Sequence, residues 1–336
     1  MYNSYIGTKP IKIYKKEKTM EHNSNEIYIP QRFERAITLH LIKNKLLDRH
    51  PTLHPPLILG VDGLPGTGKT FLCQKVLEKL GYKEILISGG ELESKNAGEP
   101  AELIRERYLK ANRILATKKY KGVAILFNDI ETGIGDWGGD TQYTVNRQTV
   151  FGELMHIVDY PNSVGGIETE RIPIILTGND FSKLYEPLTR AGRFESFTWT
   201  PTLEETLEIA YRILNFLDRA MVKGLVLALV AEYKKIGSKV IPTSFFTHFK
   251  TLLINDALWN LYLEHPTILE NQNIKLDFDK FFFNTKFEYK QLLEKGLNLL
   301  TSNYFETQLR GFNSQNNHVI KNIFDKNESL AYKQAI

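Results

Sequence analysis

The stretch Gly63-Leu-Pro-Gly-Thr-Gly68-Lys69-Thr70 decides the fold of this chain. It fits the pattern G-x-x-x-x-G-K-[ST], in which a glycine-rich loop turns its backbone N–H groups towards phosphate oxygens. An apolar run at 57–61 precedes the loop, and a helical pattern follows it. The loop therefore lies between a strand and the N-terminus of a helix, whose positive dipole end favours anions. This context predicts a phosphate-binding loop rather than a glycine-rich turn that matches by chance.

The loop residues have distinct predicted roles. Lys69 is expected to reach the β- and γ-phosphates of a nucleotide, and the Thr70 hydroxyl is expected to bind Mg²⁺. The predicted cofactors are thus ATP and Mg²⁺. In and next to the loop, the residues predicted to bind the nucleotide are Gly63, Pro65, Gly66, Thr67, Gly68, Lys69, Thr70 and Phe71. Cys73, the single cysteine, follows on the same helix and is interpreted as a small buried apolar residue.

Short apolar runs alternate with helical patterns on both sides of this loop. Runs at 57–61, 85–87, 123–127, 172–176 and 196–200 predict strands, and patterns at 31–47, 70–80, 100–116 and 144–158 predict helices. Such alternation is typical of an α/β fold with a parallel sheet that helices cover on both faces.

The pattern changes after Pro201. The segments 204–218, 221–235, 244–263 and 287–300 all read as helices. We therefore expect a smaller all-helical domain at 202–310, after an α/β nucleotide-binding domain at 26–201. Mobile tails are expected at 1–25, which is rich in lysine, and at 311–336, which is rich in Asn, Gln and Lys.

Acidic residues follow the strand predicted at 123–127. Asp129 is the candidate for the magnesium shell, for the base that polarises the attacking water, or for both. Its neighbour Asn128 supplies no charge but accepts a hydrogen bond from magnesium-bound water. Glu131 would share a strand face with Asp129 if the strand continued. A solvated loop carboxylate is an equally good interpretation of Glu131.

Three further residues complete a set that resembles the AAA+ family of ATPases. Asn179 follows the strand predicted at 172–176. The resemblance implies that an asparagine at this position orients the lytic water. It also implies that this strand lies between the strand before the phosphate loop and the strand at 123–127. Arg190 and Arg193 precede the last predicted strand, where AAA+ rings supply an arginine to the neighbouring subunit's γ-phosphate. A pair of surface arginines is the alternative. The resemblance thus implies catalytic roles for Asn128, Asp129, Asn179, Arg190 and Arg193, and a ring-shaped homo-oligomer.

Longer strings resemble one branch of that family, the Rubisco activases of the green and cyanobacterial type. They are SGGELESKNAGEPA at 88–101, TQYTVN at 141–146, IPIILTGNDFS at 172–182 and the Asn128-Asp129 pair itself. The resemblance implies a hexamer that pulls on the Rubisco large subunit and frees inhibitory sugar phosphates. It places pore loops near 91–99 and 136–143. In the second segment, Trp137 and Tyr143 are candidates either to hold an extended peptide of the substrate or to pack within the protein.

The chain also departs from the activase pattern. Ser196 stands where activases carry a lysine, and Lys250 stands where a sensor 2 arginine is expected, so that a point charge replaces a bidentate fork. These differences leave two other hypotheses open. One is an AAA+ remodeller of another protein, and the other is a nucleotide-gated assembly factor with weak turnover.

The charge and the apolar pattern of the sequence indicate which classes of partner to expect. The formal net charge of +4 lacks the broad basic field of a dedicated nucleic-acid binder, so no nucleic-acid partner is expected. No apolar run has the length that a bilayer span needs, so no membrane partner is expected either. With one cysteine, the chain fits a reducing compartment. We expect a cytoplasmic protein, in the cyanobacterial cytosol or at the carboxysome, or in the plastid stroma of a eukaryote.

Overall fold

The computed structural model describes residues 27–47, 50, 52–92, 96, 98–134, 144–235, 241–266 and 287–302. The predicted tails at 1–25 and 311–336 lie outside the described residues, as do Trp137 and Tyr143. Of the two segments proposed as pore loops, 136–143 lies outside them and 91–99 is described in part.

Five parallel strands form the central sheet in the order β2-β3-β6-β1-β7. They are β1 (Ile58–Asp62), β2 (Tyr82–Ser88), β3 (Gly122–Asn128), β6 (Ile174–Thr177) and β7 (Phe194–Thr198). All five predicted strands are confirmed, with bounds that shift by a few residues. Strand β6 lies between β1 and β3, as the AAA+ resemblance implies.

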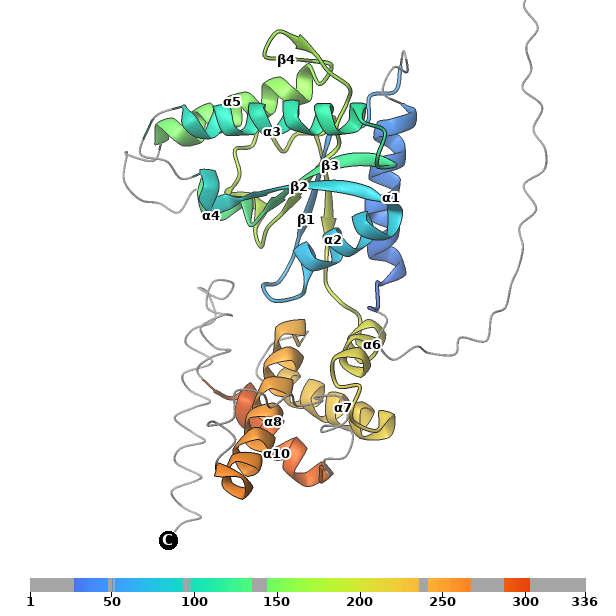
Figure 1. Cartoon of the computed structure of the whole chain (residues 1–336), viewed down its shortest axis with the longest axis vertical. Helices are drawn as coiled ribbons and strands as arrows, with labels where there is room; N and C mark the ends of the chain where they lie inside the picture. Colours follow the sequence, from blue (N-terminus) through green and yellow to red (C-terminus); the bar gives the residue numbers. More distant parts are fainter. Residues whose placement is uncertain are drawn as a thin grey trace, which may run out of the picture.

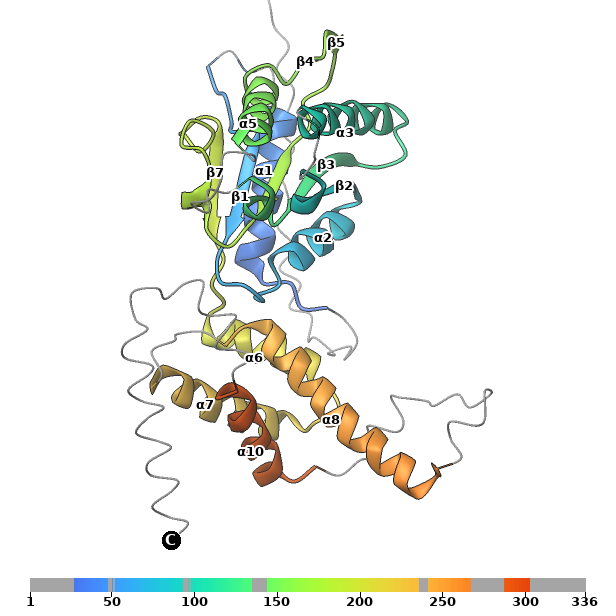
Figure 2. The ribbon, with the colours of Figure 1, turned by 90° about the vertical axis from the view of Figure 1, so that its left-hand side faces the viewer.

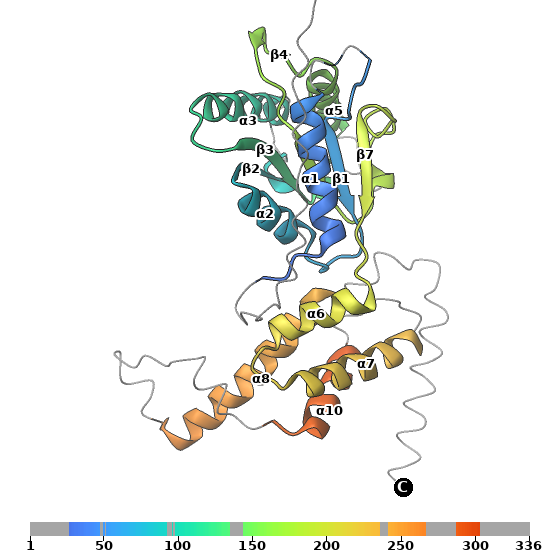
Figure 3. The ribbon, with the colours of Figure 1, turned by 90° about the vertical axis from the view of Figure 1, so that its right-hand side faces the viewer.

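Helices cover both faces of the sheet (Figures 1, 2 and 3). On one face lie α3 (Glu99–Ala116) and α5 (Thr144–Asp159), and on the other lie α1 (Gln31–Leu46) and α2 (Lys69–Leu80). Successive residues of a strand point to opposite faces of the sheet. In β3, Phe127 packs in the α3–α5 core, and Leu126 packs in the α1–α2 core. Cys73 is fully buried in the second core, where burial raises the pKa of its thiol. The predicted α/β fold and the apolar role of Cys73 are both confirmed.

Several short elements lie between the long helices and strands. They are η1 (Gly89–Leu92), α4 (Ile130–Ile134), the hairpin of β4 (Ser163–Val164) with β5 (Ile167–Glu168), and η3 (Phe181–Lys183). The elements η1 and α4 pack so closely that a Cβ on Gly133 would meet the Gly89 carbonyl oxygen at 2.2 Å. The apolar alternation that predicted the long elements did not predict these short ones.

After Thr202, the described part of the chain is helical and has its own apolar core. Its helices are α6 (Leu203–Ile213), α7 (Arg219–Lys235), α8 (Thr243–Glu264) and α10 (Tyr289–Leu300). The prediction of one helix over 204–218 was wrong in length, because Asp218 begins the next helix. Its Oδ1 accepts the N–H of Ala220 at 2.8 Å and that of Met221 at 3.3 Å. Among the described helices, none has the length and apolar character that crossing a membrane requires.

Candidate active site

The predicted site residues gather where three neighbouring strands end. Strand β1 runs into the phosphate loop, β3 ends at Asn128, and β6 ends two residues before Asn179. Because the carboxyl ends of parallel strands share one edge of the sheet, that edge is where open α/β sheets bind ligands.

The backbone of the phosphate loop depends on its glycines. Gly63, Gly66 and Gly68 have φ angles of 135°, 71° and 81°, a region that residues with a Cβ rarely adopt. A Cβ on Gly68 would meet no atom within 4 Å, so backbone conformation rather than crowding requires glycine there. Helix α2 begins at the next residue and directs its N-terminal N–H groups to this position. The loop therefore fits a phosphate group.

Lys69 joins the loop to the end of β6. Its Nζ donates to the carbonyl oxygens of Gly63 at 2.8 Å and Leu64 at 3.0 Å, and to Asn179 Oδ1 at 2.9 Å. The residue is 6% exposed, and this burial lowers the pKa of its ammonium group, against the opposing effect of the Asp129 carboxylate. Asn179, 110 positions away in the sequence, thus lies within one hydrogen bond of the lysine predicted to bind the phosphates.

Thr70 joins the loop to the end of β3. Its hydroxyl donates to Asn128 Oδ1 at 2.5 Å and lies 2.9 Å from the Thr177 hydroxyl. Asn128 in turn donates to Asp129 Oδ2 at 3.2 Å. Hydroxyl, amide and carboxylate oxygens are the ligands that Mg²⁺ prefers, directly or through water. Thr177 was absent from the predicted set, and its one signal was a polar residue at the end of a buried strand.

Glu131 differs from both interpretations that its sequence position allowed. Strand β3 ends at Asn128, Asp129 turns the chain with a φ of 49°, and Glu131 lies on α4 instead of sharing a strand face. It is not a solvated carboxylate either, since it is 1% exposed and burial raises its pKa. Its Oε1 accepts the backbone N–H of Asn179 at 2.5 Å. Glu131 therefore holds the end of β6 in place.

The two arginines pair with carboxylates of their own chain. Arg190, whose side chain is 61% exposed, forms an ion pair with Glu186, at 2.9 Å between Nε and Oε1. Arg193 binds Asp159 with two nitrogens, at 2.9 and 2.7 Å, and donates to the Pro187 carbonyl. Exposed ion pairs are weak and break easily. Arg190 is therefore the easier of the two to redirect towards a neighbouring subunit.

The structure does not bring Lys250 of α8 to the loop; its Nζ lies 5.6 Å from the centre of the Phe216 ring. The start of α8 contacts the loop instead: the Ser244 N–H donates to the Gly66 carbonyl at 2.9 Å. Phe71 is 48% exposed on α2, next to the loop. The roles of Lys250 and Phe71, like that of Pro65 in the loop turn, stay predictions.

The comparison with known families matches this architecture. Residues 60–202 match the AAA family, described as the ATPase family associated with various cellular activities. These residues form an AAA domain. The matched segment includes the phosphate loop, the acidic end of β3, Asn179 and both arginines, so the AAA domain contains every element of the site except α8.

The chain is also similar to curated plant proteins. The chain is 47% identical over 195 residues to the chloroplastic ribulose bisphosphate carboxylase/oxygenase activase of Cucumis sativus, covering 56% of this chain and 46% of that protein. It is 45% identical over 213 residues to activase 1 of Larrea tridentata (61% and 44%). It is 48% identical over 190 residues to the activase of Spinacia oleracea (55% and 39%). The match thus spans less than half the length of these relatives.

If this domain hydrolyses ATP, the contact of Glu131 with Asn179 predicts how Glu131 contributes. Glu131→Ala is expected to lower kcat by about tenfold with little change in KM for ATP, because the end of β6 loses its anchor. Glu131→Gln is expected to recover most of kcat, since its amide oxygen still accepts the Asn179 N–H. Steady-state phosphate release measures both values. Equal losses in the two variants would contradict the anchoring role.

Proposed function

We propose that this chain is an ATP-driven AAA+ remodeller that acts on Rubisco. The observation that carries the proposal is the pair of contacts, Lys69 with Asn179 and Thr70 with Asn128, that joins the phosphate loop to the ends of β6 and β3. The site lies in an AAA domain, and curated proteins to which the chain is similar are named as activases of ribulose bisphosphate carboxylase/oxygenase.

The residues of the site suit bound ATP and Mg²⁺. The loop N–H groups and Lys69 would hold the β- and γ-phosphates, and Thr70 and Asp129 would hold Mg²⁺, partly through water. The metal supplies charge neutralisation at the phosphates. Asp129 would polarise the attacking water, and Asn179, which contacts Lys69 and Glu131, would orient it. Asn128 would accept a hydrogen bond from magnesium-bound water.

The arginines support a ring, which we propose is a hexamer. If a neighbouring subunit's γ-phosphate recruits one of them, Arg190→Ala or Arg193→Ala is expected to lower kcat by about 100-fold or more, with ATP binding retained. Phosphate release measured at increasing protein concentration tests this, because a ring-dependent rate rises with assembly. Full turnover by both variants would show that neither Arg190 nor Arg193 is supplied between subunits.

The Rubisco assignment has its own experiment. Rubisco inhibited by a tightly bound sugar phosphate is incubated with this protein and ATP, and carboxylation is followed with time. Recovery that requires both ATP and Lys69 supports the proposal. If ATP is hydrolysed but the cognate Rubisco does not recover, the chain remodels another protein.

Two observations favour the alternative of a nucleotide-gated assembly factor with weak turnover. Asn128 is neutral where a second carboxylate is common in AAA+ proteins, and Lys250 faces Phe216. For that alternative, nucleotide binding would persist while phosphate release stays near the uncatalysed rate. The relatives are named chloroplastic, so we propose the plastid stroma if the chain is eukaryotic, and the cytosol or carboxysome if it is cyanobacterial.

A further inference from the structure

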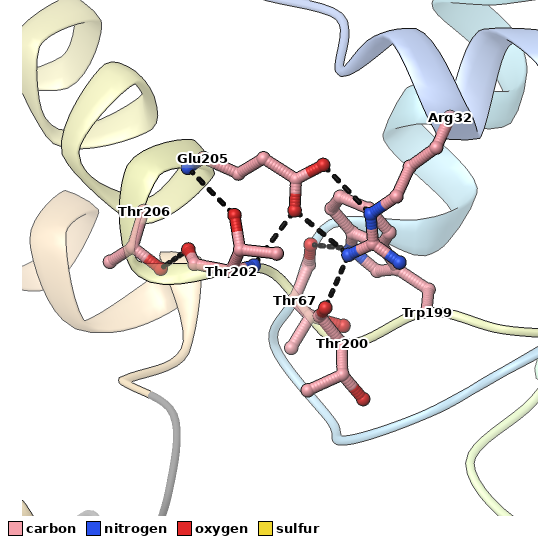
Figure 4. A network of polar contacts seen from close by, with 7 residues as sticks. All are labelled: Arg32, Thr67, Trp199, Thr200, Thr202, Glu205 and Thr206. Carbon is pink, nitrogen blue, oxygen red and sulfur yellow. Dashed lines mark hydrogen bonds and ion pairs between the residues drawn. The ribbon is translucent and has the colours of Figure 1, made fainter.

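One side chain of α1 connects three points of the segment that joins the AAA domain to the helical part (Figure 4). The Arg32 guanidinium lies over the Trp199 ring, 4.4 Å from its centre. It binds Glu205 of α6 with two nitrogens, each at 2.8 Å from a carboxylate oxygen, and it donates to the Thr200 carbonyl. Such a planar fork stacked on an aromatic ring is a geometry that arginine provides and lysine does not.

Trp199 connects this cluster to the phosphate loop. Its indole N–H donates to the Thr67 carbonyl at 3.0 Å, and the two residues are 0% and 1% exposed. In a trans peptide the C=O and N–H point in opposite directions. Because the indole holds the Thr67 carbonyl, the N–H of the same peptide unit, on Gly68, is directed away from Trp199. Trp199 therefore sets the orientation of one of the N–H groups that form the phosphate loop.

Glu205 connects the same cluster to the helical part. It forms a capping box at the start of α6: its Oε2 accepts the Thr202 N–H at 2.7 Å, and its own N–H donates to Thr202 Oγ1 at 3.2 Å. The Glu205 side chain is 11% exposed. A carboxylate so well buried loses much of its stabilisation if its cationic partner is removed. The position of α6 is thus tied to Arg32.

A second contact between the loop and the helical part lies next to the first. The Gly66 carbonyl accepts the Ser244 N–H of α8, and a Cβ on Gly66 would meet Ser244 Oγ at 2.2 Å. Two consecutive carbonyls of the phosphate loop, at Gly66 and Thr67, are therefore held by residues that follow β7. A change in the position of the helical part would reorient the loop.

We propose that Arg32 is a positioning residue for the nucleotide site. Because Arg32 contacts both Trp199 and Glu205, it fixes the phosphate loop relative to the helical part. Nucleotide affinity then depends on the contacts between the loop and the helical part. None of the nucleotide-binding motifs includes Arg32. The inference rests on the proposed ATP-binding function, and it adds a residue of α1 that does not touch the nucleotide.

The test compares equilibrium binding of a fluorescent ATP analogue by variants of the full chain. Arg32→Ala is expected to raise Kd, and KM for ATP, by about fivefold, while kcat at saturating ATP stays within about twofold. Arg32→Lys, which keeps the charge but not the fork or the stacking, is expected to recover only part of the affinity. Glu34→Gln is the matched control. It removes an ion pair of α1 with Lys79 of α2, which does not involve the helical part, and it is expected to bind the ATP analogue with wild-type affinity.

A spectroscopic measurement separates positioning from general stabilisation. The sequence has three tryptophans, so Trp137→Phe with Trp259→Phe leaves Trp199 as the reporter. Adding Arg32→Ala to that background is expected to increase quenching of Trp199 by acrylamide. If Arg32→Ala lowers Tm but changes neither quenching nor Kd, the residue is merely structural and the inference is overturned. If the wild type itself binds no nucleotide, the proposed function fails instead.

Discussion

Lys69→Ala is expected to weaken ATP binding by about 100-fold or more, which corresponds to about 2.7 kcal/mol. The Lys69 ammonium lies inside the loop, between two backbone carbonyls and Asn179. Charge-assisted hydrogen bonds to phosphate are among the strongest that proteins form, and burial makes the lost charge more costly. Alanine removes this charge and also the link between the phosphate loop and β6.

The loss is expected without unfolding. Burying the Lys69 ammonium carries a desolvation cost in the folded protein. Removing the ammonium removes this cost, which offsets part of the free energy lost with the three hydrogen bonds. Equilibrium titration with a fluorescent ATP analogue measures the affinity, and thermal unfolding checks the fold. Lys79→Ala is the control on the same helix, since Lys79 is exposed and pairs with Glu34. A Lys69→Ala variant that binds ATP with wild-type affinity would rule out the assigned phosphate contact.

Asp129→Asn is expected to abolish hydrolysis, with a loss of about 100- to 1000-fold in kcat, and to leave ATP binding nearly unchanged. The substitution removes the charge that Asp129 would supply as the proposed magnesium ligand and base. It preserves the backbone, because asparagine tolerates the left-handed conformation that Asp129 adopts at a φ of 49°. The variant therefore separates chemistry from folding.

Single-turnover phosphate release, together with a binding titration, measures the two effects of Asp129→Asn. Asp218→Asn serves as the control, because it makes the same chemical change at a helix cap where asparagine is equally suitable. If Asp129→Asn keeps its turnover, the base and metal roles belong to another residue. Glu131 would then be the first to test, since its carboxylate accepts the Asn179 N–H.

The parts of this site that the sequence predicted are those encoded by contiguous residues. The loop from Gly63 to Thr70 carries its glycines, its lysine and its hydroxyl in one short stretch, and buried parallel strands give long apolar runs. The family resemblance placed Asn128 and Asn179 at the ends of neighbouring strands. The structure brings both within hydrogen-bonding distance of the loop.

The parts that were not predicted depend on the path of the chain in space. Glu131 reaches Asn179 because Asp129 turns the backbone and α4 follows, and no periodicity in the sequence reports that turn. The contact of Trp199 with Thr67 joins residues 132 positions apart. Lys250 was assigned by resemblance alone, and its ring contact with Phe216 depends on how α8 packs against the end of α6.

The most direct test of the proposed ATPase site is to measure phosphate release by the purified chain as the ATP concentration is varied, with and without Mg²⁺. We expect a rate that saturates with ATP, requires Mg²⁺, and disappears in Lys69→Ala and Asp129→Asn. Release that does not exceed a protein-free blank at any protein concentration would contradict it. So would release that both variants retain.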